Sequence, residues 1–236
     1  MTSEPRLDII GAALGDPSRA RILCELMDGR AFTNKELASA AGITAQTASA
    51  HLGRLGGAGL TTSLRSGRHV YYRIASAEVA EVLEALATLS PRDHLARTGP
   101  KGDDTRRARS CYNHLAGRLG VQIAERLCAM QVLEHEGESE ALHPGARYGG
   151  FVRELGLDVA PRRGAQPVAR LCLDWSERRH HISGPLAIAI MQKALAMGWL
   201  ERRRASRALI VTAPGVDAFG RWFGLSRDDL EQEFDR

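Results

Sequence analysis

Apolar residues recur at helical spacing through the first thirty positions, and turn-forming residues interrupt them. Residues 4–14 predict a short helix with one apolar face. A second helix is expected to start at Asp16-Pro17, because Asp is a good N-cap and Pro suits the first helical position. Gly29 is expected to end it. The chain therefore predicts two short helices in succession.

The next two predicted helices are short, and a glycine separates them. Thr33 and Glu36 have the spacing of a capping box at the start of one helix, which is expected to end at Gly42. Thr44 is the expected cap of the following helix, whose apolar positions continue to Leu55. This pattern predicts a helix-turn-helix.

Residues 60–74 alternate apolar and polar positions around Ser66-Gly67, which predicts a β-hairpin. A hairpin after two such helices makes a winged helix-turn-helix, a module that inserts one helix into the DNA major groove. Small and amide side chains at the start of that helix suit base edges, and the nearby basic side chains suit phosphates. The candidate DNA-binding residues are Lys35, Thr44, Gln46, Thr47, Ser49, His51, Arg54, Arg65 and Arg68. For His51, a phosphate contact and a place at the edge of the core remain equal alternatives.

Charge supports this interpretation through its distribution rather than its total. Residues 1–90 carry nine basic and nine acidic residues, although the whole chain has a net charge of +4. Residues 30–75 hold six basic residues and Glu36 as the one acidic residue. Positive charge is therefore concentrated around the predicted recognition helix and hairpin, as a phosphate-binding face requires.

Together these segments resemble the ArsR/SmtB family of bacterial transcriptional repressors over roughly residues 4–90. The motifs that carry the resemblance are Asp16-Pro-Ser-Arg, Glu36-Leu-Ala, Thr47-Ala-Ser-Ala-His-Leu-Gly-Arg-Leu, Ala58-Gly-Leu and Gly67-Arg-His-Val-Tyr-Tyr-Arg. The resemblance implies a homodimeric repressor that binds an inverted-repeat operator in double-stranded DNA and leaves it when an effector binds. It also implies a dimer interface built from the first and last helices of the domain, and the apolar stripe within residues 76–90 fits the last helix.

The chain departs from the family at the familiar metal sites. Phe32-Thr-Asn-Lys-Glu-Leu-Ala lacks the cysteines of the arsenic and cadmium sensors, and residues 77–89 lack the Asp and His of the zinc sensors. Neither metal site can be transferred to this sequence. An effector site is therefore expected beyond the winged helix.

The sequence predicts a linker at 91–105 and a second domain over 106–236, behind a first domain at 1–90. Helices are expected at 106–133, 143–155, 185–197 and 214–223, with a hairpin before the last of them. The predicted fold class is mainly α with short β-hairpins (α+β). A degenerate winged-helix-like helical domain is expected to follow the winged helix-turn-helix.

Candidate metal chemistry lies in this second domain. On the predicted helix Cys111 and His114 share one face, and Cys172 and Asp174 share one side of an extended segment shortly before His181. Thiolate and imidazole suit a divalent metal such as zinc, although this spacing is not a known zinc signature. The same cysteines could also sense a thiol-reactive effector. An organic ligand in an apolar pocket, or no effector site in this domain, are the alternatives. The two remaining cysteines, Cys24 and Cys128, lie on apolar helical faces and are expected to pack in the core.

Other function classes receive less support from the sequence. No oxyanion loop, phosphate cradle or cofactor fingerprint accompanies the cysteines, so an enzyme is not expected. No apolar run is long enough for a membrane span, and the first residues lack the apolar core of a signal peptide, which favours the cytoplasm. A winged-helix protein-interaction module that does not read DNA is the rival interpretation.

Overall fold

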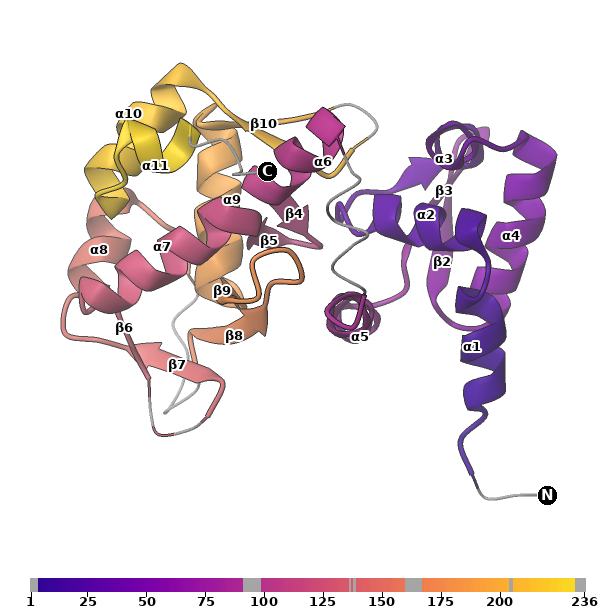
Figure 1. Ribbon diagram of the computed structural model, residues 1–236, viewed down its shortest axis with the longest axis horizontal. Helices are drawn as coiled ribbons and strands as arrows, with labels where there is room; N and C mark the ends of the chain where they lie inside the picture. The colour runs from indigo at the N-terminus through magenta and orange to yellow at the C-terminus, as the bar shows by residue number, and fades with distance from the viewer. Residues whose placement is uncertain are drawn as a thin grey trace. The chain divides into compact units, whose positions relative to one another are not determined.

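The structure, a computed structural model, describes residues 4–90, 99–135, 137, 139–159, 167–203 and 206–231. These residues form two compact units (Figure 1). The N-terminal unit reaches Leu83 and includes a short segment at Ser206, and the C-terminal unit holds the rest of the chain from Glu84 onward. The predicted domain boundaries at 90 and 106 stay predictions.

The N-terminal unit is a winged helix-turn-helix, as the sequence predicts. Its helices are α1 (Leu7–Leu14), α2 (Pro17–Leu26), α3 (Asn34–Ala41) and α4 (Ala45–Gly57), and its strands are β1 (Phe32–Thr33), β2 (Thr61–Ser66) and β3 (His69–Ile74). The strands form an antiparallel sheet in the order β1-β3-β2. Helix α5 (Ala77–Ala87) begins in this unit, and its residues from Glu84 belong to the C-terminal unit.

Local capping explains where these helices begin and end. The Asp16 carboxylate accepts two backbone N–H bonds at the start of α2, and Thr33 and Glu36 form the predicted capping box at α3. Gly42, with φ +68°, ends α3, and the Thr44 hydroxyl accepts the Thr47 N–H at 3.1 Å to start α4. Each such cap stabilises its helix by about 1 kcal/mol.

The C-terminal unit mixes helices with short antiparallel strands. Its helices are α6 (Gly99–Arg107), α7 (Gly117–Ala129), α8 (Tyr148–Leu155), α9 (Pro185–Ala196), α10 (Ala213–Phe223) and α11 (Arg227–Glu231). Its strands are β4 (Arg109–Cys111), β5 (His114–Ala116), β6 (Leu133–His135), β7 (Ala141–Pro144), β8 (Ala169–Leu173), β9 (His180–Ser183), β10 (Leu200–Arg202) and β11 (Leu209–Val211). Strands β6-β7-β8-β9 form one sheet in that order, and β4-β5 and β10-β11 form two-stranded pairs.

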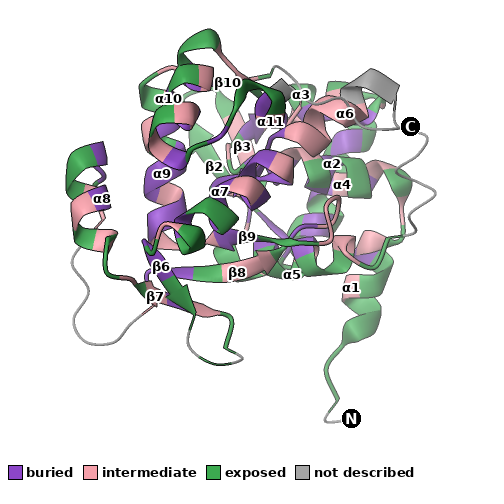
Figure 2. Ribbon diagram, turned by 60° about the vertical axis from the view of Figure 1, so that its left-hand side comes forward, coloured by how far each residue is buried: buried purple, intermediate pink, exposed green. Residues whose placement is uncertain are grey.

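Half of the residues of helix α9 are buried in the core of this unit (Figure 2). Its Leu186 and Ile190 belong to one apolar cluster with Leu127 of α7 and Phe219 and Phe223 of α10. Burying side chains of this size stabilises the fold by roughly 1.5–3 kcal/mol each. The cluster gives the short strands a rigid support.

The predicted helix over 106–133 is wrong in its first third. Helix α6 ends at Arg107, and β4 and β5 follow before α7 begins. Tyr112 (φ +58°) and Gly117 (φ +77°) have left-handed backbone conformations that cannot continue a right-handed helix. Part of the predicted linker, residues 99–105, belongs to α6, and residues 91–98 of it lie outside the described residues.

Of the other predictions for this unit, some are confirmed and one begins at a different residue. The helix, hairpin and helix at its end are confirmed as α9, β10-β11 and α10. The helix expected from residue 143 begins at Tyr148 instead, because His143 and Pro144 belong to β7. The sequence did not predict the four-stranded sheet. Within the described residues, no helix is long and apolar enough to span a membrane.

Candidate functional site

The structure brings four of the five predicted metal-site residues together in the C-terminal unit. One side-chain ligand atom from each of Cys111, His114, Cys172 and His181 lies within 4.8 Å of all the others. Cys111, His114 and His181 are buried, and Cys172 is half-buried. Two sulfur and two nitrogen ligands therefore surround one point.

Two hairpins supply these residues in the same way. Cys111 lies opposite His114 in the β4-β5 pair, and Cys172 lies opposite His181 in the β8-β9 pair. Residues directly opposite in antiparallel strands present their side chains on the same face. The left-handed conformation of Tyr112 allows the two-residue turn that sets Cys111 against His114. Each hairpin thus contributes one thiol and one imidazole.

The dimensions of the cluster suit a tetrahedral zinc ion. Zinc bonds of roughly 2.0–2.3 Å place neighbouring ligand atoms about 3.3–3.8 Å apart. The Nε2 atoms of His114 and His181 are 3.1 Å apart. This separation is close to the spacing that two nitrogen ligands of one zinc ion have.

Asp174 lies behind His181 rather than in the ligand set, which differs from the sequence prediction. Its Oδ2 is 3.2 Å from Nδ1 of His181, the ring nitrogen that faces away from the cluster. Oδ2 also accepts the Gly117 N–H at 2.7 Å and pairs with Arg109 Nη2 at 2.9 Å. A carboxylate on the far nitrogen of a metal-binding His sets the orientation and basicity of the ring. Asp174 is therefore placed to position His181.

Two glycines make the close packing behind the cluster possible. A Cβ on Gly117, at φ +77°, would lie 2.6 Å from the Arg106 carbonyl oxygen. A Cβ on Gly120 would lie 2.6 Å from the Leu115 carbonyl oxygen and 3.4 Å from Cβ of His181. Glycine at both positions lets α7 start directly after β5 and approach the site.

Sequence reasoning missed both glycines and Arg109. The spacing Gly117-x-x-Gly120, just after His114, is a signal of close backbone approach that could have drawn attention to this segment. Arg109 carried no such signal, because an arginine beside an apolar position is usually solvated. The structure buries it completely between Asp174 and the α5 carboxylate of Glu84.

The two histidines have different environments. Burial alone would lower the pKa of His181, but Asp174 and Cys172 outweigh it and raise the pKa to about 9. Burial lowers the pKa of His114, whose Nδ1 lies 3.2 Å from Asn113 Oδ1. Without an ion, one charged and one neutral imidazole therefore face each other near pH 7.

The pKa values of the two clustered thiols are shifted in opposite directions. The hydrogen bond from Cys111, helped by His114 and His181, lowers the pKa of Cys172 to about 2. The same hydrogen bond, together with burial and the nearby Glu84, raises the pKa of Cys111 well above its usual value. Cys172 is thus a thiolate held ready to bind a cation, and Cys111 keeps its proton until something displaces it.

The remaining cysteines lie elsewhere, and the prediction that they pack in the core is wrong. Cys24 and Cys128 are both exposed. Each follows a buried residue on its helix, Leu23 on α2 and Leu127 on α7, and is turned toward solvent. Their positions make them useful controls for the clustered cysteines.

The predicted DNA-binding residues lie on one compact part of the N-terminal unit. Eight of them are exposed on α3, α4, the turn between these helices, or the β2-β3 hairpin, namely Lys35, Thr44, Gln46, Thr47, Ser49, Arg54, Arg65 and Arg68. The buried face of α4, formed by Ala48, Leu52 and Leu55, packs inward. The opposite face is free of large apolar side chains, as a helix that enters a groove requires.

His51 differs from the other predicted DNA-binding residues. Its ring is half-buried, with Nδ1 3.3 Å from Arg19 Nη1 and Nε2 3.8 Å from Asp16 Oδ1. This arrangement corresponds to the core-edge alternative. A contact between His51 and DNA stays a prediction.

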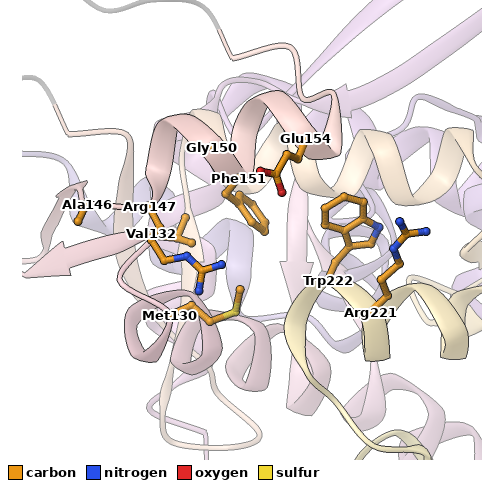
Figure 3. A pocket seen from close by; sticks show the side chains of 9 residues that line it. All are labelled: Met130, Val132, Ala146, Arg147, Gly150, Phe151, Glu154, Arg221 and Trp222. Carbon is orange, nitrogen blue, oxygen red and sulfur yellow. The ribbon is translucent and has the colours of Figure 1, made fainter.

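A separate cavity of about 400 Å³ lies at the other end of the C-terminal unit (Figure 3). Met130, Phe151 and Trp222 are among its lining residues, and its charged lining consists of Arg147, Arg221 and Glu154. The Arg221 guanidinium lies over the Trp222 ring, 5.3 Å from its centroid. Such a cavity suits a small organic ligand with an anionic group.

The chain also has clear relatives. A helix-turn-helix domain family matches residues 14–63. The uncharacterised HTH-type transcriptional regulator YdfF of Bacillus subtilis is 39% identical over 219 residues, which cover 91% of this chain and 96% of YdfF. The chain is a transcriptional regulator of the ArsR/SmtB family. It therefore belongs to a family of DNA-binding regulators.

Two further relatives show how the likeness is distributed within this ArsR/SmtB regulator. The HTH-type transcriptional regulator Rv0324 of Mycobacterium tuberculosis is 28% identical over 211 residues, covering 87% of this chain and 90% of that protein. CmtR of the same species is 40% identical over 83 residues, covering 35% of this chain and 70% of CmtR. The solved structure of CmtR, described as a cadmium metal-sensor, matches 35% of this chain and 81% of its own with a TM-score of 0.29. The match to YdfF, unlike that to CmtR, includes most of the C-terminal unit.

Proposed function

We propose that this regulator is a metal-responsive repressor that binds an inverted-repeat operator as a homodimer and leaves it when the C-terminal unit takes up a divalent ion. Zn²⁺ is the ion whose chemistry fits best, held by Cys111, His114, Cys172 and His181. The observation that carries the proposal is the convergence of two thiol and two imidazole ligands within 4.8 Å. When bound, the ion would draw both hairpins to one centre.

The experiment that tests the metal site is elemental analysis of the purified protein. Wild type should bind one zinc per chain after exposure to Zn²⁺, and Cys111→Ser and Cys172→Ser should each lose most of it. Cys128→Ser, a change at an exposed cysteine outside the cluster, is the matched control and should bind as wild type does. Equal zinc content in all four proteins would overturn the assignment.

DNA recognition rests on the exposed face of α4 and on the β2-β3 hairpin. Gln46 on the first turn of α4 can pair with adenine in the major groove, and Arg54 and Arg68 can reach phosphates. Gln46→Ala should weaken discrimination at one base position by roughly 1–3 kcal/mol. Operator binding competed by variant duplexes would measure this loss.

The hairpin arginine should act differently from Gln46. Arg68→Ala should weaken binding to every duplex and lower the slope of log affinity against log salt by about one. Arg6→Ala, at an exposed arginine before α1 that pairs with Asp8, is the control and should change neither quantity. If wild type binds no duplex at low salt, a protein-interaction role for the winged helix would replace DNA reading.

The homodimer is proposed from an unpartnered apolar stripe. Helix α5 exposes Val82 and Leu86, and the stripe continues to Leu89, which is 78% exposed. Helix α1 also exposes two large apolar side chains, Leu7 and Ile9, although their spacing does not place them on one face of the helix. Apolar stripes of this kind at helical spacing suit packing against a second copy of the chain.

The cavity beneath α8 supports a second candidate effector. A small organic anion would place its apolar part against Phe151 and Trp222 and its charge near Arg147 or Arg221. Titration of the protein with aromatic carboxylates, followed by Trp fluorescence, tests this role. Release of DNA by such a compound in Cys172→Ser would favour the cavity over the metal cluster as the effector site.

A further inference from the structure

Four buried ionisable side chains form a continuous row from the metal cluster to α5. Nδ1 of His181 lies 3.2 Å from Asp174 Oδ2, and that oxygen lies 2.9 Å from Arg109 Nη2. The same Nη2 lies 3.9 Å from Oε1 of Glu84. Arg109, Asp174 and His181 are fully buried, and Glu84 is 3% exposed. Glu84 is the member of the row that belongs to α5.

The Glu84 end of the row is held on two sides. The second carboxylate oxygen of Glu84 lies 3.5 Å from Arg207 Nη1. Burial alone would raise the pKa of Glu84. The positive charges of Arg207 and Arg109 outweigh that effect and lower the pKa. The Trp175 ring, next to Asp174, lies 4.4 Å from the Arg109 guanidinium and 5.8 Å from that of Arg207. Buried charges that lose a partner are strongly destabilising, so these groups must move together.

The hairpin that carries Cys172 and His181 also holds the end of α5 directly. Arg178, in the turn between β8 and β9, donates to the carbonyl oxygens of Thr88 and Ser90, the second at 3.1 Å. Arg178 adopts a left-handed φ of +55°, which costs a non-glycine residue roughly 1–2 kcal/mol. The contact to the helix end helps to compensate for that conformation.

We propose that Arg109 and Glu84 are positioning residues that couple occupation of the metal cluster to α5. This inference rests on the proposed function. The ring of His181 has its Nε2 in the cluster and its Nδ1 on Asp174, so an ion at Nε2 sets the angle at which Nδ1 meets the carboxylate. Arg109 contacts both Asp174 and Glu84, so a shift of the Asp174 carboxylate changes the position of Glu84 as well. Because α5 continues back to Ala77 and carries the exposed apolar stripe, the ion biases the element that the proposed dimer uses.

Coupling of this kind is a difference in DNA affinity between the metal-free and metal-bound protein. A typical coupling lies between about 5-fold and 150-fold. Residues of the row do not touch DNA in the proposed recognition mode, and Glu84 is not one of the four ligands. Glu84 also lies beside the Cys111 thiol and raises its pKa, so a change at Glu84 can alter Zn²⁺ affinity. The coupling is therefore compared at saturating Zn²⁺, where a change at Glu84 should reduce it.

The test compares Glu84→Gln with Glu81→Gln in the full chain. Both changes remove one carboxylate charge from α5, but Glu81 is exposed. Zn²⁺ affinity is measured by chelator competition, and DNA affinity with and without Zn²⁺ is measured on a duplex selected from a random pool by the metal-free wild type. In wild type and Glu81→Gln, Zn²⁺ should weaken DNA binding by about 10-fold to 100-fold. In Glu84→Gln the change at saturating Zn²⁺ should be less than about 3-fold, with metal-free DNA affinity within about 3-fold of wild type.

The outcomes separate this inference from the proposed function. If Glu84→Gln binds Zn²⁺ and keeps the wild-type change in DNA affinity, the row does not couple the two sites, and the metal response stands. If wild type takes up no Zn²⁺, or its DNA affinity does not change, both proposals are overturned.

A second measurement on wild type does not depend on any variant folding. Zn²⁺ should slow backbone amide hydrogen exchange at residues 84–90 by at least about 10-fold, and leave α3 of the N-terminal unit unchanged. Equal exchange rates at 84–90 with and without Zn²⁺ would overturn the coupling.

Discussion

The two units of this regulator are specified by their sequence in different ways. In the winged helix, partners are close along the chain, as in the Thr33–Glu36 capping box. At the Cys/His cluster they are distant, because Gly117 and Asp174 are 57 positions apart and His114 and His181 are 67 positions apart. Nearby partners produce patterns that can be recognised in a single sequence, whereas distant partners become visible only after folding.

The same difference predicts how each unit responds to change. A cap or a turn contributes separately from its neighbours, so its loss affects one helix end. The buried charges around Asp174 depend on one another, so a single change there reaches several residues. Substitutions in each unit and changes of pH can therefore test this difference between the two units.

The largest expected effect is the pH dependence of zinc affinity. Near pH 7 His181, with a pKa of about 9, and Cys111, with a strongly raised pKa, both carry protons that an ion must displace. Cys172, with a pKa of about 2, and His114, with a lowered pKa, carry none. Zinc affinity should therefore rise about 100-fold per pH unit from pH 6 to 8, since each displaced proton contributes tenfold.

Above pH 9 the dependence should fall to about tenfold per unit, because His181 has then lost its proton and Cys111 has not. Chelator competition at a series of pH values measures both slopes. A flat profile between pH 6 and 8 would contradict this protonation scheme. The DNA affinity of the metal-free protein, measured at the same pH values, gives the corresponding pH dependence for the N-terminal unit.

The next effect concerns two glycines with left-handed backbones, one in each unit. Gly117→Ala should destabilise the C-terminal unit by roughly 2–4 kcal/mol, because its Cβ would meet the Arg106 carbonyl and its φ is strained for alanine. Gly42→Ala, whose Cβ would meet nothing within 4 Å, should cost about 1–2 kcal/mol in the winged helix.

Fluorescence can distinguish the two units, since Trp175, Trp199 and Trp222 all belong to the C-terminal unit. Urea unfolding followed by Trp fluorescence should shift to lower urea in Gly117→Ala and stay at the wild-type midpoint in Gly42→Ala. Equal shifts in both variants would contradict the independence of the winged helix.

The smallest of these effects is expected from the carboxylate behind His181. Asp174→Asn should lower zinc affinity by about 10-fold to 100-fold, because a neutral amide orients the imidazole less well and leaves Arg109 with Glu84, at 3.9 Å, as its remaining carboxylate partner in the row. Asp229→Asn, at a carboxylate that caps α11 through Ser226, is the control and should retain wild-type affinity. Equal affinity in both variants would show that Asp174 does not position His181.

The sequence predicted much of the winged helix because its signals are local. Asp16, Thr33 and Thr44 start the helices where the capping rules place them, and Gly67 lies in the hairpin turn. At the Cys/His cluster the sequence predicted the four ligand residues, but the helix predicted around Cys111 and His114 was wrong. Cys111 and His114 meet across a two-residue turn between strands of three residues, which are too short to show a period of two.

Neither Arg109 nor Asp174 could be given its place from the sequence, because each is defined by a partner on another element. A buried arginine and a surface arginine look alike in a single chain. Their difference lies in the residues that surround them, and for Arg109 these include residues from α5 and from the turn between β8 and β9.

The pairing of each thiol with an imidazole on its own hairpin has a consequence for folding. An ion bound to both hairpins would be a cross-link, closing a loop of 58 residues between His114 and Cys172 (172 − 114). In the unfolded chain a covalent bridge across such a loop removes entropy worth roughly 4 kcal/mol. The bound ion would thus act as a reversible cross-link. A chelator would withdraw structural support from the whole C-terminal unit at the same time as it withdraws the signal.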